Sequence, residues 1–292
     1  MQDRTNNLPI GIFDSGIGGM TVVRAMARLL PQESIYYFGD TIRCPYGPRP
    51  LEQVRRFALQ IGHWLDQQQI KLLVIACNTA TAAALTELQQ ELDIPVLGVI
   101  MPGARAATQA TQNRRVAVIG TKATIESGLY AESIRTLDAG ITVFSTATPL
   151  FVEIAESGLK LDRNPVETFM SRLTSVYTRP ALQEIARDYL DPLKRCQVDT
   201  LVLGCTHYPL LRPLIETIMG PRVAIISSAD EVAADVAGLL RRRELFNDGS
   251  APATRQFATT AVDLPEFMHL ATAILGHVVD RVRQVDLTEL GA

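Results

Sequence analysis

Two stretches of the chain, LLVIACNTATAAAL (72–85) and TLVLGCTHYPLLRPL (200–214), share one layout. Each begins with a continuous apolar run, passes through a cysteine and a polar residue, and continues into a helical pattern. Continuous apolar strands followed by helices are typical of parallel sheets that are covered on both faces. The repeat therefore predicts two related α/β halves, which present Cys77 and Cys205 at the carboxyl ends of their strands.

A second pair of similar segments supports the same division. IGIFDSGIGG (10–19) resembles VAVIGTKATI (116–125). An alternative explanation of both pairs is that unrelated strand–helix units have converged on a similar pattern. Ligands of open α/β sheets bind at the carboxyl ends of the strands. We therefore expect an α/β fold with two pseudo-symmetric parallel-sheet domains and the active site in the cleft between them. The first domain is expected to span 1–100 and to be completed by 211–292, with 101–210 as the second.

Apolar runs and helical periodicity alternate along most of the chain. The expected strands are 10–13, 34–38, 72–76, 96–99, 116–119, 141–144, 200–203, 223–226 and 257–262. The expected helices are 19–30, 51–68, 79–91, 102–111, 123–138, 207–219, 229–242 and 265–276. The region 149–195 shows no obvious strand and is predicted to be a helical insertion.

Composition excludes several classes of protein. The 292 residues are 47% hydrophobic and carry a net charge of −3, so no positive field would hold nucleic acid. No apolar run approaches the ~20 residues of a membrane span, and the first nine residues lack a signal-peptide core. We expect a cytoplasmic protein that does not bind membranes. The four cysteines show no CxxC spacing, which predicts thiols and no metal site.

The two repeated cysteines are predicted to be reactive. Each precedes polar residues at the expected start of a helix: Asn78 and Thr79 follow Cys77, and Thr206 follows Cys205. The free N–H groups and positive dipole end of a helix favour a thiolate and can also hold a carboxylate. The alternative is that both thiols are small buried hydrophobic groups.

Further polar residues follow the first two strands. Asp14 and Ser15 end the first strand and precede three glycines that would allow a close backbone approach to a ligand. Asp14 could touch a substrate ammonium group or assist a thiol, or it could simply cap a helix. After the second strand, Tyr46 and the Gly47 amide lie in a loop and could donate hydrogen bonds to a small ligand.

His207 lies two residues after Cys205 and could act as an acid or orient a thiol. Glu153 is a weaker candidate that could equally belong to a solvated helix face, and Cys44 is expected to serve packing. The segment GIGGMT lacks the closing glycine of a dinucleotide fingerprint. No lysine stands in an evident pyridoxal-phosphate context, so no cofactor is indicated.

Four motifs in order, DSGIGG, GDTIRCPYG, ACNTATA and LGCTHYPLL, resemble those of the glutamate racemases of the aspartate/glutamate racemase superfamily. The resemblance runs from about residue 10 to 276. It implies cofactor-independent racemisation of L-glutamate to D-glutamate for peptidoglycan synthesis, cell wall biogenesis and cell shape. It also implies a homodimer.

The resemblance assigns roles residue by residue. Cys77 and Cys205 match the two catalytic thiols, the first acting on D-glutamate and the second on L-glutamate. Substrate-contacting positions match Asp14, Ser15, Tyr46, Gly47, Asn78, Thr79, Thr206 and His207. Asp14 and His207 match residues that assist the thiols, and Asp40 and Glu153 match acidic family positions. This chain departs from the family at Cys44, where valine is common, and at TTAVD (259–263).

Racemisation needs one group to remove the α-proton and another to return a proton from the opposite side. Two thiols can do both, because one starts as thiolate and the other as thiol. Three rivals stay open: an aspartate racemase, a non-catalytic amino-acid-binding or regulatory protein, and a redox protein with a Cys77–Cys205 disulfide. Activity on each amino acid, calorimetry and thiol titration would separate them.

Overall fold

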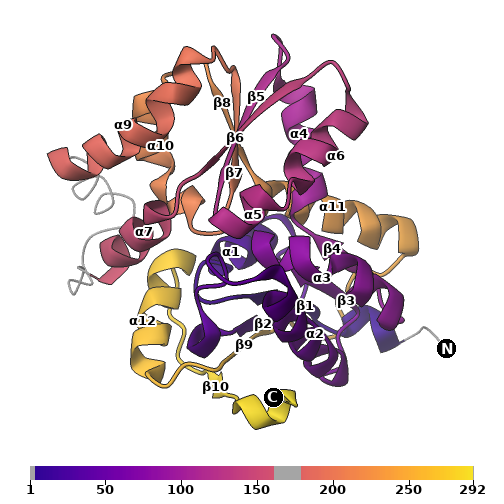
Figure 1. Ribbon diagram of the computed structural model, residues 1–292. Helices are drawn as coiled ribbons and strands as arrows, with labels where there is room; N and C mark the ends of the chain where they lie inside the picture. Colours follow the sequence, from indigo (N-terminus) through magenta and orange to yellow (C-terminus); the bar gives the residue numbers. More distant parts are fainter. Residues whose placement is uncertain (1–3, 161–178, 292) are drawn as a thin grey trace. The chain divides into compact units, whose positions relative to one another are not determined.

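The computed structural model describes residues 4–160 and 179–291, which divide into two compact units (Figure 1). The first unit comprises Met1–Val99 and Ala229–Ala292, and the second unit comprises Ile100–Ser228. The chain thus returns to the first unit at Ala229, later than the expected position 211. The difference has a topological reason, because the strand at Ala224–Ser227 pairs with the sheet of the second unit.

The first unit is built on a six-stranded sheet with the order β10-β9-β2-β1-β3-β4, in which every pairing is parallel. Its strands are β1 (Ile10–Asp14), β2 (Ile35–Gly39), β3 (Leu72–Ile75), β4 (Val96–Gly98), β9 (Arg255–Thr259) and β10 (Arg283–Gln284). Its α-helices are α1 (Met20–Leu29), α2 (Leu51–Gln67), α3 (Asn78–Glu91), α11 (Ser228–Arg243) and α12 (Leu264–Leu275). Short 3-10 helices occupy η1 (Arg4–Asn7), η2 (Thr41–Arg43) and η4 (Leu287–Leu290).

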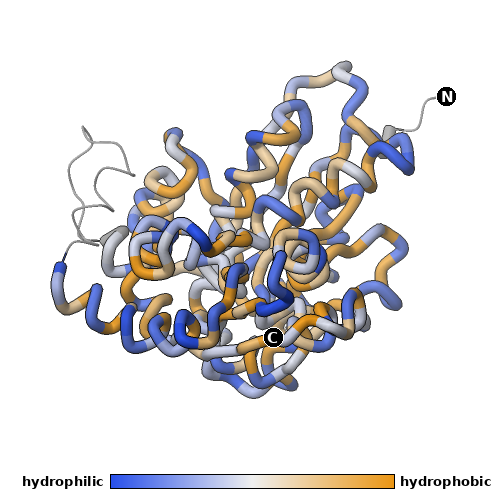
Figure 2. Tube along the Cα trace, turned by 90° about the horizontal axis from the view of Figure 1, so that it is seen from above, coloured by the Kyte–Doolittle hydropathy of each residue, from blue (hydrophilic) through white to orange (hydrophobic). Residues whose placement is uncertain are grey.

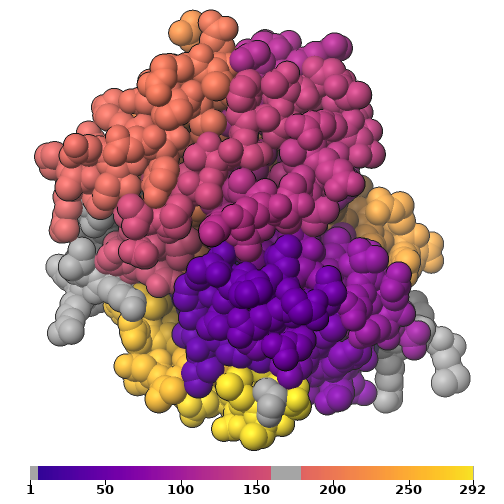
Figure 3. All heavy atoms as spheres, viewed as in Figure 1, coloured from indigo at the N-terminus to yellow at the C-terminus, as the bar shows by residue number. Residues whose placement is uncertain are grey.

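The C-terminal part of the chain completes this sheet. Strand β9 pairs with β2, and β10 extends the edge beyond it. In Figure 3 the yellow C-terminal residues adjoin the indigo N-terminal residues of the same unit. The sequence predicted β9 and α12 but not β10, because two exposed residues carry no alternating or apolar pattern.

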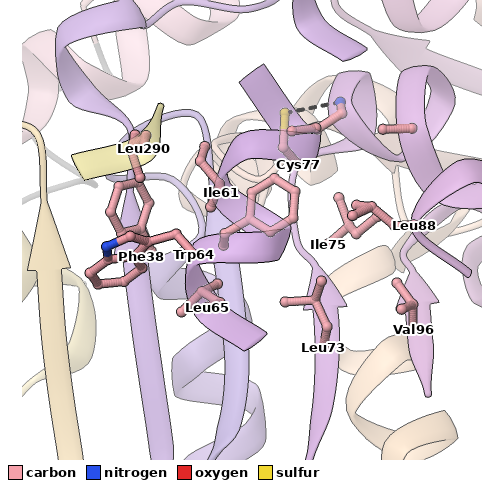
Figure 4. Close-up of a cluster of buried hydrophobic side chains, with 14 of the residues drawn as sticks. Phe38, Ile61, Trp64, Leu65, Leu73, Ile75, Cys77, Leu88, Val96 and Leu290 are labelled. Atoms are coloured by element: carbon pink, nitrogen blue, oxygen red, sulfur yellow. Dashed lines mark hydrogen bonds between the residues drawn. The ribbon is translucent and has the colours of Figure 1, made fainter. Parts of the chain in front are cut away.

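A hydrophobic cluster packs α2 and α3 onto β1–β3 (Figure 4). Trp64 of α2 lies edge-on to Tyr36, with ring centroids 5.9 Å apart, and tilted against Phe38 at 5.1 Å. Leu290 from η4 reaches into the same cluster, and Cys77 lies at its edge. Aromatic packing of this kind buries large apolar areas, so the junction between β3 and α3 is held rigidly.

The second unit is built on a four-stranded parallel sheet with the order β6-β5-β7-β8. Its strands are β5 (Arg115–Gly120), β6 (Thr142–Ala147), β7 (Thr200–Gly204) and β8 (Ala224–Ser227). Its helices are α4 (Ile100–Ala110), α5 (Lys122–Glu126), α6 (Leu129–Leu137), α7 (Leu150–Lys160), α9 (Pro180–Arg195), η3 (Tyr208–Leu211) and α10 (Arg212–Met219). In Figure 1, α4 and α6 lie on one side of this sheet and α9 and α10 on the other.

The two sheets share one topology, which confirms the predicted α/β class with two parallel sheets. The order β2-β1-β3-β4 in the first unit has the same form as β6-β5-β7-β8 in the second. In both, the cysteine follows the strand that neighbours the unit's first strand. The sequence repeat therefore corresponds to a structural repeat, to which β9 and β10 are an addition.

The predicted helical insertion at 149–195 contains α7 and α9, and its residues 161–178 lie outside the described part of the chain. Helix α9 buries Ala186, Leu190 and Leu193 and exposes polar residues. Figure 2 shows such apolar and polar residues alternating along the helices. Among the described residues, no helix has both the length and the apolar character needed to cross a membrane.

Candidate active site

The first half-site comprises Cys77, Asp14 and Ser15, at the carboxyl edge of the first sheet. Parallel pairing brings these residues together, because β1 and β3 are neighbours and the Ala76 N–H donates to the Phe13 carbonyl at 2.9 Å. The Cys77 thiol donates to the Ser15 hydroxyl, with sulfur and oxygen 3.7 Å apart. All three side chains are buried. The DSG and ACN motifs therefore meet within this unit.

Cys77 is the N-cap of α3. Its backbone is extended, and its Sγ accepts a hydrogen bond from the Ala80 N–H at 3.4 Å. Because Cys77 caps this 14-residue helix, its sulfur lies at the positive end of the helix dipole. A hydrogen bond to sulfur and the positive helix end both favour the thiolate over the thiol. The arrangement suits a thiol that gives up and takes back a proton.

Two of the glycines after Asp14, Gly16 and Gly19, pack closely within the turn. A Cβ on Gly19 would lie 2.4 Å from the Asp14 Cβ and 2.9 Å from the Tyr37 hydroxyl. A Cβ on Gly16 would lie 3.0 Å from the Cys44 sulfur. The turn thus wraps tightly around Asp14. Cys44, as expected, packs against this turn.

Asp40 organises the loop that follows β2. Its Oδ2 accepts hydrogen bonds from Arg43 Nε, at 2.6 Å, and from the Tyr46 hydroxyl. Its Oδ1 accepts one from Thr260 Oγ1 at 3.1 Å. From its place in the sequence Tyr46 could donate a hydrogen bond to a small ligand; in the structure its hydroxyl donates to Asp40. Burial, followed by the Asp40 charge, raises the pKa of Tyr46 well above its usual value.

The second half-site comprises Cys205, His207 and Glu156 in the second unit. Cys205 Sγ lies 3.8 Å from His207 Nδ1, and His207 Nε2 lies 3.1 Å from Glu156 Oε1. Burial disfavours the charged imidazole, but hydrogen bonds to Cys205 and Glu156 outweigh burial and raise the pKa of His207 to about 10. Cys205 therefore has a cationic partner at neutral pH.

The helix start predicted after Cys205 is wrong in detail. A 3-10 helix, η3, occupies Tyr208–Leu211, and the α-helix α10 begins only at Arg212. The Tyr208 hydroxyl, which donates to the Thr148 carbonyl at 2.9 Å, ties η3 to the end of β6. A dipole effect falls off within the first turn, so α10 cannot act on Cys205 as α3 acts on Cys77. His207 supplies the positive charge instead.

The acidic residue that contacts His207 is Glu156, which was not among the candidate residues named from the sequence. Glu153 and Glu156 both lie on α7, but Glu153 is exposed and Glu156 is about one-third exposed and turned toward His207. The two positions are three residues apart and therefore lie on neighbouring parts of one helix face, about 60° apart. Only the packing of α7 against η3 shows which carboxylate reaches the imidazole.

Other predicted residues fall into the same two groups. Asn78 and Thr79 are buried in the first turn of α3, and Gly47 is buried in the Asp40 loop. Thr206 is buried next to Cys205. All four cysteines lie in the described part of the chain and are thiols. Within residues 4–160 and 179–291, no cluster of histidine, cysteine or acidic residues is placed to hold a metal ion.

The chain matches the model of a known protein family. The family model described as Asp/Glu/Hydantoin racemase matches residues 10–236, which include both half-sites. The chain belongs to the Asp/Glu/Hydantoin racemase family. The matched residues of this racemase-family chain thus include both strand–cysteine segments.

Individual relatives match almost the whole racemase-family chain. The glutamate racemase of Bacillus cereus is 42% identical over 281 residues, covering 96% of this chain and 98% of the relative. The crystal structure of glutamate racemase isoform RacE1 from Bacillus anthracis is 40% identical, with a TM-score of 0.87, covering 97% and 98% of the two chains. That of glutamate racemase from Francisella tularensis, in complex with D-glutamate, is 31% identical, with a TM-score of 0.84, covering 97% and 98%.

The His207–Glu156 contact leads to a prediction about titration. Replacing Glu156 by glutamine removes a charge beside the imidazole and is expected to lower the pKa of His207 by ~1 unit or more. NMR titration of the labelled imidazole measures this shift. Glu153→Gln is the matched control, because Glu153 is exposed on the same helix. An unchanged His207 titration in Glu156→Gln would show that the carboxylate does not hold the proton.

The same shift sets a pH window for stability. The folded-state pKa of about 10 exceeds the ordinary value of 6.5. The stabilisation from the charged imidazole is therefore fully present below pH 6.5 and is lost as the pH rises through 10. In Glu156→Gln the loss should begin at lower pH.

Proposed function

We propose that this chain is a glutamate racemase that interconverts L- and D-glutamate without a cofactor. The observation that carries the proposal is the near-full-length likeness to glutamate racemases, one of them crystallised with D-glutamate. The paired cysteines, each at the carboxyl end of an equivalent strand, support it. Racemisation has a direct use for two such groups, because one must remove the α-proton and the other must return a proton.

Cys77 and Cys205 act as the two bases of the reaction. One thiolate removes the Cα proton, and the other thiol donates its proton to the opposite face of the carbanion. The first cysteine ends as thiol and the second as thiolate, so the pair is ready for the opposite enantiomer. Hydrogen bonds to the substrate carboxylate must absorb the developing charge. We assign these to Ser15, Asn78, Thr79 and Thr206.

The two thiols have different helpers. His207, in contact with both Cys205 and Glu156, is assigned to assist Cys205, which removes the proton of L-glutamate. Cys77 begins as the thiol that donates to Ser15 and protonates the carbanion. Asp14, the neighbour of Ser15, receives the role of assisting Cys77. Tyr46, Gly47 and Asp40 shape the substrate-facing loop of the first unit.

Incubation of the purified chain with L-glutamate in deuterated water tests the reaction. Circular dichroism should show decay of the optical signal to zero without any added cofactor. Mass spectrometry should find one solvent deuterium at Cα of the D-glutamate formed, because the returned proton comes from a solvent-exchanged thiol. D-glutamate without deuterium would exclude the two-thiol route.

Parallel measurements with aspartate distinguish the closest rival. We expect kcat/KM for glutamate to exceed that for aspartate by ~100-fold or more, because a shorter side chain leaves buried polar groups unpaired. The reverse preference would make the chain an aspartate racemase. Glutamate binding in calorimetry without any optical change would make it a non-catalytic binding protein.

The biological setting follows from the same proposal. D-glutamate formed by this chain would supply peptidoglycan synthesis, and hence cell wall biogenesis and cell shape, in the cytoplasm. We also propose a homodimer, on the basis of the family resemblance alone. Analytical ultracentrifugation of the purified chain would test the homodimer.

A further inference from the structure

Tyr37 lies in the middle of β2 and is fully buried. Its hydroxyl donates a hydrogen bond to the Gly16 carbonyl, with the two oxygens 2.5 Å apart. None of the four sequence motifs contains Tyr37, and the proposed reaction does not use it. A buried hydroxyl directed at the turn of the first half-site therefore requires an explanation of its own.

The Ser15–Gly16–Ile17 turn is held from two sides. The Gly16 N–H donates to Asp14 Oδ2 at 3.1 Å, and the Gly16 carbonyl accepts from Tyr37. These contacts restrain the peptide groups on both sides of Gly16. The Ser15 side chain, which receives the Cys77 thiol at 3.7 Å, therefore takes its position from the same turn.

The surroundings of the Tyr37 hydroxyl allow little rearrangement. The hydroxyl lies 2.9 Å from where a Cβ on Gly19 would be, beside the Asp14 side chain. Burial, followed by the charges of Asp14, Cys44 and Cys77, raises the pKa of Tyr37 well above its ordinary value. The phenol thus stays protonated and remains a donor through the pH range in which the enzyme would work.

We propose that Tyr37 is a positioning residue that sets the acidity of Cys77 through the turn at Gly16. Without its hydroxyl, the buried Gly16 carbonyl loses its donor, and the turn must shift to find another. Ser15 then moves away from the sulfur, so its hydroxyl, which accepts from the thiol and can turn to donate to the thiolate, no longer stabilises the thiolate. The Asp14 carboxylate also loses a restrained N–H that offsets its charge. Both changes disfavour the Cys77 thiolate.

The consequence for racemisation rests on the proposed function, but the acidity of Cys77 can be measured without turnover. In Tyr37→Phe, the pH profile of Cys77 alkylation by iodoacetamide is expected to move upward by ~1 unit. Mass spectrometry of digested protein follows each cysteine separately, so Cys205 in the other unit is an internal standard with an unchanged profile. Cys77 interacts electrostatically with Tyr37 and Tyr46, and Tyr37 also interacts with Asp14 and Cys44; only Tyr37 is altered.

Turnover gives a second readout. We expect kcat of Tyr37→Phe to fall by about tenfold with KM nearly unchanged, which is the size of effect that one lost hydrogen bond allows. Tyr36→Phe is the matched control: it removes the neighbouring hydroxyl on β2, from a ring that packs on Trp64 away from the turn. Its Cys77 profile and its kcat should remain at wild-type values.

A wild-type Cys77 profile in folded Tyr37→Phe would overturn the proposal. If this variant does not fold, Gly19→Ala decides in the same assay, because the added methyl group pushes Asp14 and Tyr37 apart. A Gly19→Ala profile equal to wild type would equally overturn it. Failure of the proposed function would look different: the chain would not racemise glutamate, while the alkylation profiles would still respond to Tyr37.

Discussion

Cys77→Ser and Cys205→Ser are each expected to lower the rate of glutamate racemisation by a factor on the order of 10³, the scale of a positioned general acid or base. Serine keeps the shape of cysteine and its hydrogen bonds, but its hydroxyl is a far weaker acid than a thiol. Each variant therefore lacks the acid or base on one face of the carbanion and cannot complete the racemisation. Circular dichroism with L- and D-glutamate as separate substrates measures the loss.

Cys196→Ser is the matched control for these two variants. Cys196 is a partly exposed thiol at the end of α9 in the second unit and follows no strand. Its replacement should leave the rate within about twofold of wild type, as expected for a site away from the chemistry. Near-normal turnover by either Cys77→Ser or Cys205→Ser would exclude the two-thiol scheme.

Lys71→Met is expected to destabilise the first unit by about 3–5 kcal/mol, because it removes the ion-pair partner of a buried carboxylate. Lys71 and Glu33 form an ion pair in which both side chains are 1% exposed. Lys71 Nζ also donates to the carbonyls of Asn6, at 2.7 Å, and Leu245, at 2.8 Å. The lysine therefore joins the N-terminal segment, β3 and the end of α11. The midpoint of urea unfolding, followed by far-UV circular dichroism, measures the effect.

Burial lowers the pKa of Lys71 despite its contact with Glu33, so the intact pair adds little net stability. The cost arises when one partner is removed. Lys122→Met is the matched control, because Lys122 pairs with Glu126 at 3.8 Å and both side chains are more than 60% exposed. An exposed pair of this kind contributes about 0–1 kcal/mol. Equal unfolding midpoints for the two variants would contradict the buried-pair argument.

Much of the fold and the two strand-end cysteines are encoded locally in the sequence. The apolar runs of β1, β3, β5 and β7 predict buried parallel strands, because strands covered on both faces lack polar alternation. The repeated strand–cysteine segments predict two similar units, and the sheet orders confirm this. A pattern of neighbouring residues was sufficient for these conclusions.

Contacts between distant segments were decided by the tertiary structure. Glu156 meets His207, and Tyr37 meets Gly16, only because α7 and β2 pack at particular angles and registers. The same holds for β8, whose pairing with β7 delays the return of the chain to Ala229. Hydrophobic patterning specifies which face of an element is buried, but a hydrogen bond depends on distances of a few tenths of an ångström. The sequence by itself thus determined the strands and the paired cysteines, and only packing determined which side chains restrain those thiols.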